Sequence, residues 1–132
     1  MTLTPLSIAI ADDHNLFRKG VIQILKSYPE ITVVADAGNG AELLEKIEAQ
    51  LPDVVMLDLE MPEMDGIVTS RYLLSKYPDV KILIMSSYGE ESLVESLLQE
   101  GVKGYLLKSV EPDELRHVLQ RVARGQALTS GS

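Results

Sequence analysis

Short apolar runs alternate along this chain with longer stretches in which apolar residues recur at helical spacing. The run from Asp53 to Asp58 is continuously apolar between its two acids, and Pro62 and Gly66 follow it closely. Such a run, without polar alternation, is typical of a strand buried on both faces, as in a parallel sheet covered by helices. Proline and glycine then end the strand and mark a loop that leads into the next helix. Asp58 is therefore expected where the strand leaves the core.

The same alternation occurs five times. Apolar runs predict strands at 6–11, 31–35, 53–58, 80–85 and 104–107. Apolar residues at helical spacing predict helices at 14–28, 41–50, 65–77, 93–100 and 112–122. Strict alternation implies right-handed crossovers and a parallel sheet between two layers of helices. The predicted fold is α/β, a doubly wound (βα)5 flavodoxin-like three-layer sandwich with strand order 2-1-3-4-5.

The composition describes one globular domain. The chain has 132 residues, of which 45% are hydrophobic and 24% charged, so it has material for one core. We expect a domain at residues 1–124 and the start of a linker or a tail at 125–132. No apolar run approaches the roughly 18 residues of a membrane span, and the first residues lack the pattern of a secretory signal. A cytoplasmic protein that does not bind membranes is expected.

The residue types restrict the chemistry. There is no cysteine, and the two histidines, His14 and His117, are far apart in the sequence. Disulfides, thiolate catalysis, cysteine–zinc sites and a histidine metal cage are therefore excluded, and any metal must be held by oxygen. The net charge of −8 argues against this segment itself gripping a nucleic-acid backbone, which usually requires a basic face.

Polar residues end four of the predicted strands. In the order 2-1-3-4-5 the switch point lies between the first and third strands, which end in Asp12-Asp13 and in Asp58. The next two strands end in Ser86 and Lys108. The topology thus brings three carboxylates, a hydroxyl and an ammonium group to one edge of the sheet.

This set of groups favours metal-assisted phosphoryl transfer. Three close carboxylates repel one another and need a countercharge, for which Mg²⁺, or Mn²⁺ in its place, is the natural choice. Asp12, Asp13, Asp58 and the backbone carbonyl of Glu60 are the predicted ligands. Asp58 is the predicted nucleophile toward phosphorus, and the Lys108 ammonium would neutralise the transferring group. The Ser86 hydroxyl would donate a hydrogen bond to it.

Each of these residues taken alone has an ordinary explanation. An acid pair such as Asp12-Asp13 commonly precedes a helix, and Asp58 alone is a common strand-end acid. Ser86 is a common turn residue, and a lone lysine such as Lys108 is usually a solvated surface charge. Their joint placement at neighbouring strand ends is what favours a site. No catalytic role is assigned to the two histidines.

From about residue 6 to 124, the sequence resembles a known family, the response-regulator receiver (CheY-like) domain. The matching motifs are Ile-Ala-Asp-Asp-His at 10–14, Met-Leu-Asp-Leu-Glu-Met-Pro at 56–62, Met-Asp-Gly at 64–66, Ser-Ser at 86–87 and Gly-Tyr-Leu-Leu-Lys at 104–108. The resemblance implies that Asp58 accepts phosphate from a cognate histidine kinase and that Asp12 and Asp13 bind Mg²⁺. It also implies a signalling domain that catalyses only its own phosphorylation and dephosphorylation.

The resemblance further implies a switch carried by Ser86, Tyr105 and Lys108. Tyr105 and Lys108 are separated by an odd number of residues, so their side chains are expected on opposite faces of the strand. A Ser86 side chain that moves toward a phosphoryl group would leave space for Tyr105. The change would alter the surface formed by the fourth helix, fifth strand and fifth helix, where a partner could sense it.

The motifs are most similar to the NarL/FixJ subfamily of LuxR-type transcription regulators, whose members continue into a helix-turn-helix domain. DNA is therefore expected to be bound only through a C-terminal domain that this chain does not include. A phosphorylation-dependent homodimer is also expected, through the first and fifth helices or through the fourth-helix side. Two positions depart from the common pattern: Ser109 follows the lysine where proline is frequent, and Ser86 replaces threonine.

Two further residues, Glu60 and Tyr88, are expected to overhang the path of water to an acyl phosphate and to tune its lifetime. Two alternatives remain open. The first is a receiver-like interaction module that works without phosphorylation. The second, less favoured, is a phosphatase of the haloacid dehalogenase type, in which the acid two residues after the nucleophile acts as general acid. Asp58 and Glu60 imitate that arrangement only loosely, and the chain has no residues left for a substrate-enclosing cap.

Overall fold

A computed structural model describes residues 5–62, 64–87, 89–124 and 128–129. Its elements are β1 (Leu6–Ala11), α1 (Asn15–Lys26), β2 (Ile31–Ala37), α2 (Gly40–Ile47), β3 (Val54–Asp58), α3 (Gly66–Lys76), β4 (Lys81–Ser86), α4 (Glu91–Glu100), β5 (Gly104–Leu107), α5 (Pro112–Ala123) and β6 (Leu128–Thr129). The sheet has the order β2-β1-β3-β4-β5-β6, and neighbouring strands are parallel. The doubly wound flavodoxin-like fold with order 2-1-3-4-5 is therefore confirmed.

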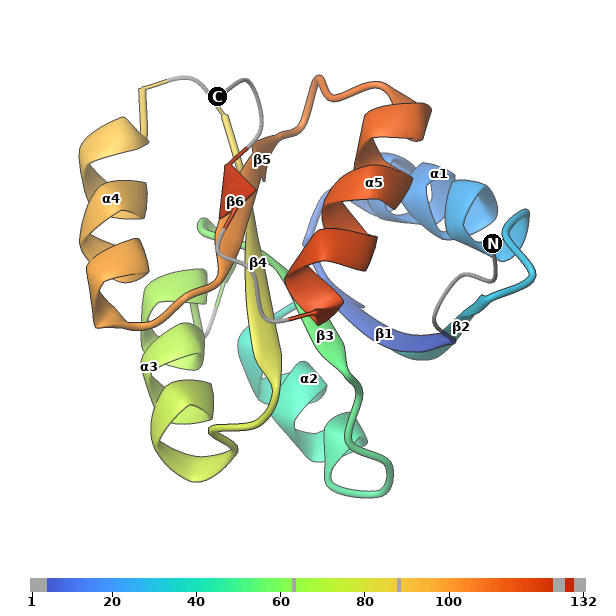
Figure 1. Ribbon diagram of the computed structural model, residues 1–132. Coiled ribbons are helices and arrows are strands. Elements are labelled where there is room, and N and C mark those ends of the chain that lie inside the picture. The colour runs from blue at the N-terminus through green and yellow to red at the C-terminus, as the bar shows by residue number, and fades with distance from the viewer. Residues whose placement is uncertain (1–4, 63, 88, 125–127, 130–132) are drawn as a thin grey trace.

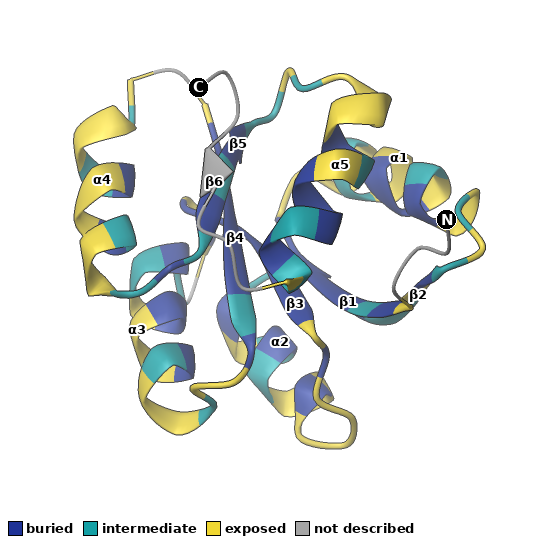
Figure 2. Ribbon diagram, viewed as in Figure 1, coloured by how far each residue is buried: buried dark blue, intermediate teal, exposed yellow. Residues whose placement is uncertain are grey.

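Helices cover both faces of the sheet. Figure 1 shows α3 and α4 on one side of it, with α2 beside α3, and α1 and α5 on the other side. The side chains of β3 alternate between the two cores: Val55 and Leu57 pack on the α2–α4 side, and Val54 and Met56 on the α1 and α5 side. Both sets are fully buried, which explains why this strand is continuously apolar in sequence. Figure 2 shows the same distribution: the strands are buried between the two layers of helices, and the outer surfaces of the helices are exposed.

Two strands differ from the sequence prediction. β2 continues through Asp36 to Ala37, whereas the apolar pattern predicted a strand that ends at residue 35. The Asp36 side chain is 47% exposed and pairs with Arg18 of α1, while its backbone pairs with Ile10 of β1. At the opposite edge of the sheet, the two-residue strand β6 pairs with β5. The sequence did not predict this strand, because one leucine followed by one threonine is too short a pattern to indicate it.

The start of α3 lies very close to the end of β3. Gly66 donates its backbone N–H to the carbonyl oxygen of Leu59 at 2.9 Å. A Cβ atom at Gly66 would lie 2.1 Å from the backbone oxygen of Asp58, which is far inside van der Waals contact. The carboxylate of Asp65 caps the same helix by accepting from the backbone N–H of Val68 at 3.0 Å. A glycine at this position therefore lets the helix fix the backbone that carries Asp58.

Among the described residues, no helix has both the length and the apolar character needed to cross a bilayer.

Candidate functional site

The side chains of two acids, at the carboxyl ends of β1 and β3, meet the side chain of Lys108, which directly follows β5. The Nζ atom of Lys108 lies 2.9 Å from Oδ2 of Asp12 and 3.3 Å from Oδ2 of Asp58. The side chains of Asp12 and Asp58 are only 0% and 6% exposed, and that of Lys108 is 15% exposed. Two carboxylates that are nearly removed from water thus share one ammonium group.

The site has the ligands and the free lone pairs that a hard cation requires. Asp12, Asp13, His14 and Asp58 each offer one ligand atom, and these atoms lie within 4.8 Å of one another. The Oδ2 atoms of Asp12 and Asp58 are buried, and neither accepts an aligned hydrogen bond from the described residues. The three carboxylates therefore fit Mg²⁺ or Mn²⁺, which prefer oxygen donors.

His14 also belongs to this cluster, although no catalytic role was predicted for it. Its Nδ1 atom lies 2.8 Å from Nζ of Lys108 and 3.2 Å from Oδ1 of Asp12. Its backbone N–H donates to the same Asp12 oxygen at 2.8 Å. The signal in the sequence was its position directly after the acid pair and before α1, but spacing alone does not reveal which way the imidazole points.

Burial and, after it, the negative charge of Asp12 raise the pKa of Asp58, and the ammonium group of Lys108 opposes both effects. The net result is a pKa raised from 3.8 to about 6. Asp58 is thus ionised at neutral pH, but at a cost to the folded state. An added positive charge would relieve that cost.

Ser86 lies on β4, which is next to the strand of Asp58, and Tyr105 lies on β5, one strand further along the sheet. Ser86 is the last residue of β4, is 2% exposed, and its backbone oxygen accepts from the N–H of Lys108 at 2.9 Å. Tyr105 is half-buried and packs against the core on the α2–α4 side. Lys108 instead lies over the ring of Phe17 of α1, with Nζ 4.9 Å from the ring centre. Tyr105 and Lys108 therefore point to opposite faces of the sheet.

A hollow of about 510 Å³ opens beside the acid cluster. It is lined by the exposed residue Glu60, by Asp13 and His14 of the site, and by Glu90 before α4. Glu60 thus lines a hollow next to the acid cluster, and its predicted role in the lifetime of an acyl phosphate stays a prediction. Tyr88 lies outside the described residues.

The fold and this site together define a flavodoxin-like α/β domain with an acidic, cation-competent pocket at the carboxyl edge of its sheet. Comparison with known families identifies it more closely. The pattern of the response regulator receiver domain matches residues 8–120, and the chain belongs to this family.

Individual relatives agree with this assignment. The chain is 43% identical over 92% of its length to the transcriptional regulatory protein DegU of Brevibacillus brevis, and 39% identical over 96% to the nitrate/nitrite response regulator protein NarL of Escherichia coli K12. It covers 52% and 58% of those two proteins, and so spans about half the length of the curated relatives it matches. Among solved structures, the receiver domain of the putative response regulator NarL of Mycobacterium tuberculosis superposes with a TM-score of 0.86 at 36% identity, over 93% of this chain and 99% of that one.

Proposed function

We propose that this domain is the phosphoacceptor of a two-component response regulator and that Asp58 receives a phosphoryl group from a histidine kinase. The observation that carries the proposal is the shared ion pair: the buried carboxylate of Asp58 lies 3.3 Å from the ammonium group of Lys108 and within 4.8 Å of a second and third acid. A nucleophilic carboxylate, a fixed cation and a set of metal ligands are the groups that such a transfer requires.

In the proposed reaction a carboxylate oxygen of Asp58 attacks the phosphorus of a phosphohistidine. The new P–O bond forms as the P–N bond breaks, and the electron pair returns to the imidazole of the kinase. Lys108 pairs with the incoming phosphoryl oxygens, and the Ser86 hydroxyl donates to one of them. Asp12, Asp13, Asp58 and the backbone carbonyl of Glu60 would hold Mg²⁺ or Mn²⁺, which, when bound, supplies charge neutralisation.

The same residues would carry the switch. Ser86 would move toward the phosphoryl group, and the half-buried ring of Tyr105 would turn inward on the next strand. The surface of α4, β5 and α5 would then change, and with it the tendency of the domain to form a homodimer.

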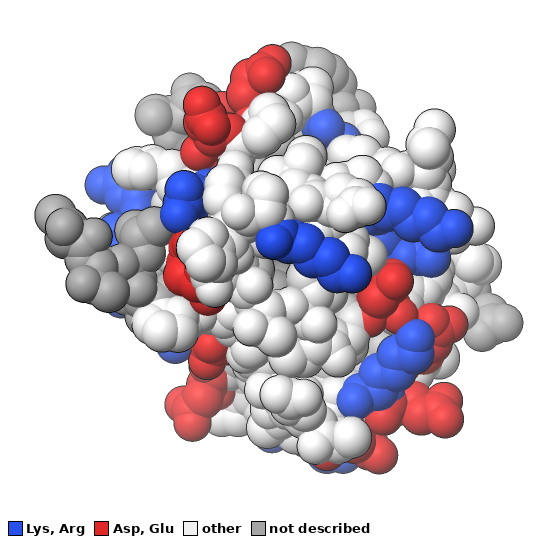
Figure 3. Space-filling model, turned by 90° about the vertical axis from the view of Figure 1, so that its right-hand side faces the viewer, with Lys and Arg blue, Asp and Glu red and all other residues white. Residues whose placement is uncertain are grey.

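We further propose that the complete protein is a cytoplasmic transcription regulator with a LuxR-type DNA-binding domain. DegU, of which this chain covers 52%, is named as a transcriptional regulatory protein, which supports the proposal. On the face shown in Figure 3, positive and negative side chains of the described residues are interspersed around a broad uncharged area. Binding to a phosphate backbone favours a basic face, so we assign DNA binding to the other domain.

Phosphotransfer to the wild type and to the Asp58→Asn variant tests the proposal. The proteins are incubated with Mg²⁺ and a phosphorylated histidine kinase or acetyl phosphate, and phosphate incorporation and oligomeric state are measured. We expect incorporation into the wild type alone, lost when EDTA is added. Equal incorporation in both proteins would reject Asp58 as the acceptor. Turnover of a phosphatase substrate without stable labelling would instead favour a hydrolase.

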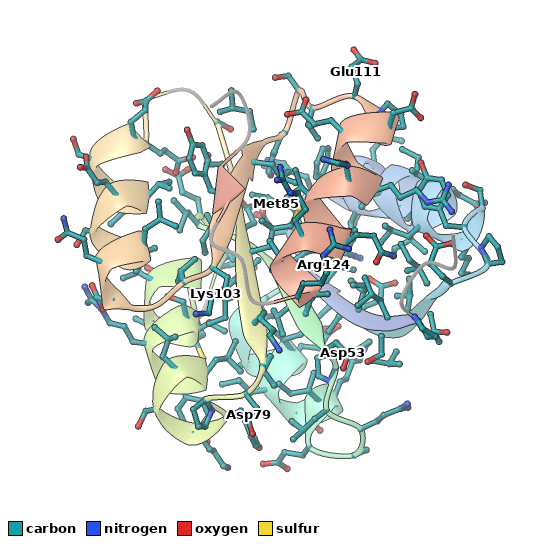
Figure 4. The ribbon with its side chains drawn as sticks, viewed as in Figure 1. Asp53, Asp79, Met85, Lys103, Glu111 and Arg124 are labelled. Atoms are coloured by element: carbon teal, nitrogen blue, oxygen red, sulfur yellow. The ribbon has the colours of Figure 1, made fainter. Side chains whose placement is uncertain are left out.

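Glu60 is proposed to set the lifetime of the phosphoryl group, because it is two residues after Asp58 and lines the hollow next to Asp13 and His14 of the site. We expect Glu60→Ala to change the dephosphorylation rate severalfold while initial labelling still goes to completion. Lys103→Ala is the control, because Lys103 lies before β5, at the end of the sheet away from Asp58 (Figure 4). Asp53, which lies before β3 at the same end, is less suitable because it accepts hydrogen bonds from Ser7. Equal decay rates in Glu60→Ala and the wild type would remove this role. Tyr88 has the same predicted role.

A further inference from the structure

Arg18 of α1 reaches back to the loop that carries the acid pair. Its side chain is only 12% exposed. One guanidinium nitrogen, Nη1, donates to the backbone carbonyl oxygen of Asp12. The Nε atom lies 2.5 Å from Oδ1 of Asp36 at the end of β2. A single side chain thus connects the first helix, the end of the edge strand and the first predicted metal ligand.

The contact matters because Asp12 is completely buried and both polar groups of its backbone have a partner. Its backbone N–H donates to the carbonyl oxygen of Ala37 at 3.0 Å. Its carboxylate accepts from the N–H of His14 at 2.8 Å and lies 2.9 Å from Nζ of Lys108. Arg18 supplies the contact to the remaining polar group, the carbonyl oxygen. Water cannot easily replace it, because Asp12 is 0% exposed.

The carbonyl oxygen belongs to the peptide that joins Asp12 to Asp13. The orientation of this peptide sets the direction in which the next side chain projects. The side chain of Asp13 is 37% exposed, and its Oδ1 atom lies 3.9 Å from Nδ1 of His14. The backbone therefore does more to place the Asp13 carboxylate than its own side-chain contacts do.

We propose that Arg18 is a positioning residue for the cation site: it fixes the Asp12-Asp13 peptide so that both carboxylates are directed into the pocket, and Asp36 braces the guanidinium. This inference rests on the proposed function, since it assigns Arg18 a part in binding the same cation. Partners that orient metal ligands typically change metal affinity by 10- to 100-fold when removed. Holding ligands in place before binding reduces the ordering that the metal must otherwise impose.

A titration with Mg²⁺ alone tests the proposal. Binding is followed by two-dimensional ¹H–¹⁵N NMR in the wild type, Arg18→Ala, Arg18→Lys and Lys19→Ala. We expect Arg18→Ala to raise the Kd for Mg²⁺ about tenfold and Arg18→Lys to recover part of the affinity, because lysine keeps a cationic donor. Lys19→Ala is the matched control, since Lys19 is an exposed cation next in sequence on the same helix, and it should bind as the wild type does.

The rate of phosphorylation by acetyl phosphate gives a second readout. For Arg18→Ala, the Mg²⁺ concentration at half-maximal rate should rise about tenfold while the rate at saturating Mg²⁺ stays within about twofold of the wild type. A residue that merely stabilises the fold would lower the urea midpoint without moving the Mg²⁺ dependence of the folded domain. If Arg18→Ala does not fold, Arg18→Lys and Asp36→Asn carry the test, each with a Kd raised severalfold.

An unchanged Mg²⁺ affinity in every folded Arg18 variant overturns the inference. A wild type that binds Mg²⁺ but accepts no phosphate would reject the proposed function, while the comparison of Mg²⁺ affinities would still decide the role of Arg18. A wild type that binds no Mg²⁺ would overturn both.

Discussion

Asp58 should reduce the stability of the metal-free domain, so that replacing it with asparagine stabilises the fold. Asparagine has nearly the same shape as aspartate but no charge. The carboxylate of Asp58 is 6% exposed and shares the ammonium group of Lys108 with the buried carboxylate of Asp12. Removing the charge of Asp58 leaves Lys108 paired with Asp12 alone, in a site that no longer holds two negative charges beside one cation.

The magnitude follows from the pKa. The pKa of Asp58 is about 6 in the folded domain, against an ordinary 3.8. At about 1.4 kcal/mol per pKa unit, ionisation costs the folded state about 3 kcal/mol relative to the unfolded chain. Some of this gain is offset by the imperfect hydrogen bonding of a buried asparagine amide, which costs about 1 kcal/mol. We therefore expect Asp58→Asn to raise the free energy of unfolding by about 2 kcal/mol at pH 7.5.

The pH dependence has a definite sign. Below pH 3.8 the carboxyl group of Asp58 is protonated in both states and contributes no difference. Between pH 3.8 and about 6 the unfolded chain loses its proton first, so the wild type loses stability as the pH rises. Above about 6 the full penalty is present. The stability gap between Asp58→Asn and the wild type should thus open over this interval and stay constant at higher pH.

Urea unfolding in EDTA, at pH 7.5 and at pH 4, measures the gap. Removal of any acid from a chain of net charge −8 relieves some general repulsion, so a control is needed. Asp79→Asn serves as that control, because Asp79 is exposed and lies before β4, at the end of the sheet away from the site (Figure 4). Its stability should stay within about 0.5 kcal/mol of the wild type. An Asp58→Asn variant that is less stable at pH 7.5, or whose gain is the same at pH 4, would refute the reasoning.

Two further comparisons test how the fold supports the site. Gly66→Ala should strongly destabilise the domain, since the added Cβ would lie 2.1 Å from the backbone oxygen of Asp58. Gly20→Ala in α1, where a Cβ would meet nothing within 4 Å, should instead stabilise it by about 0.5–1 kcal/mol. Equal urea midpoints for the two variants would contradict the packing argument. Arg116→Ala should lower the urea midpoint more than Arg71→Ala. Both arginines make bidentate ion pairs, but the partner of Arg116, Glu30, has a side chain only 7% exposed. A larger drop in urea midpoint for Arg71→Ala would show that burial of the partner does not determine which ion pair stabilises the fold more.

Much of the site could be predicted from the sequence because topology determines it. Once the strands are parallel and ordered 2-1-3-4-5, the residues after them must share one edge of the sheet. Asp12, Asp58 and Lys108 therefore had to lie near one another, whatever the details of packing. The apolar run of β3 indicated the sheet so clearly because both of its faces are buried.

Other parts of the site depend on the direction in which individual side chains point, and the apolar and polar pattern of the sequence does not contain that information. His14 and Arg18 both precede or begin a helix, and their spacing is equally compatible with solvent exposure. What places them is the path of the chain between β1 and α1, which turns the imidazole toward Lys108 and the guanidinium toward the carbonyl of Asp12. The end of β2 was missed for a related reason: an acid such as Asp36 suggests a loop, but here its carboxylate pairs with Arg18 while its backbone continues the strand.

The charges of the pocket explain why it is suited to switching. Three carboxylates face one ammonium group, which leaves an excess of two negative charges in a site where two of the acids are buried. A divalent cation would offset that excess and would therefore favour the ionised form of Asp58. In the proposed reaction, phosphorylation would add negative charge close to Ser86, at the end of β4, and to Lys108, directly after β5. Because α4 follows β4 and α5 follows β5, we expect a change of charge at the site to alter contacts on the proposed α4, β5 and α5 surface.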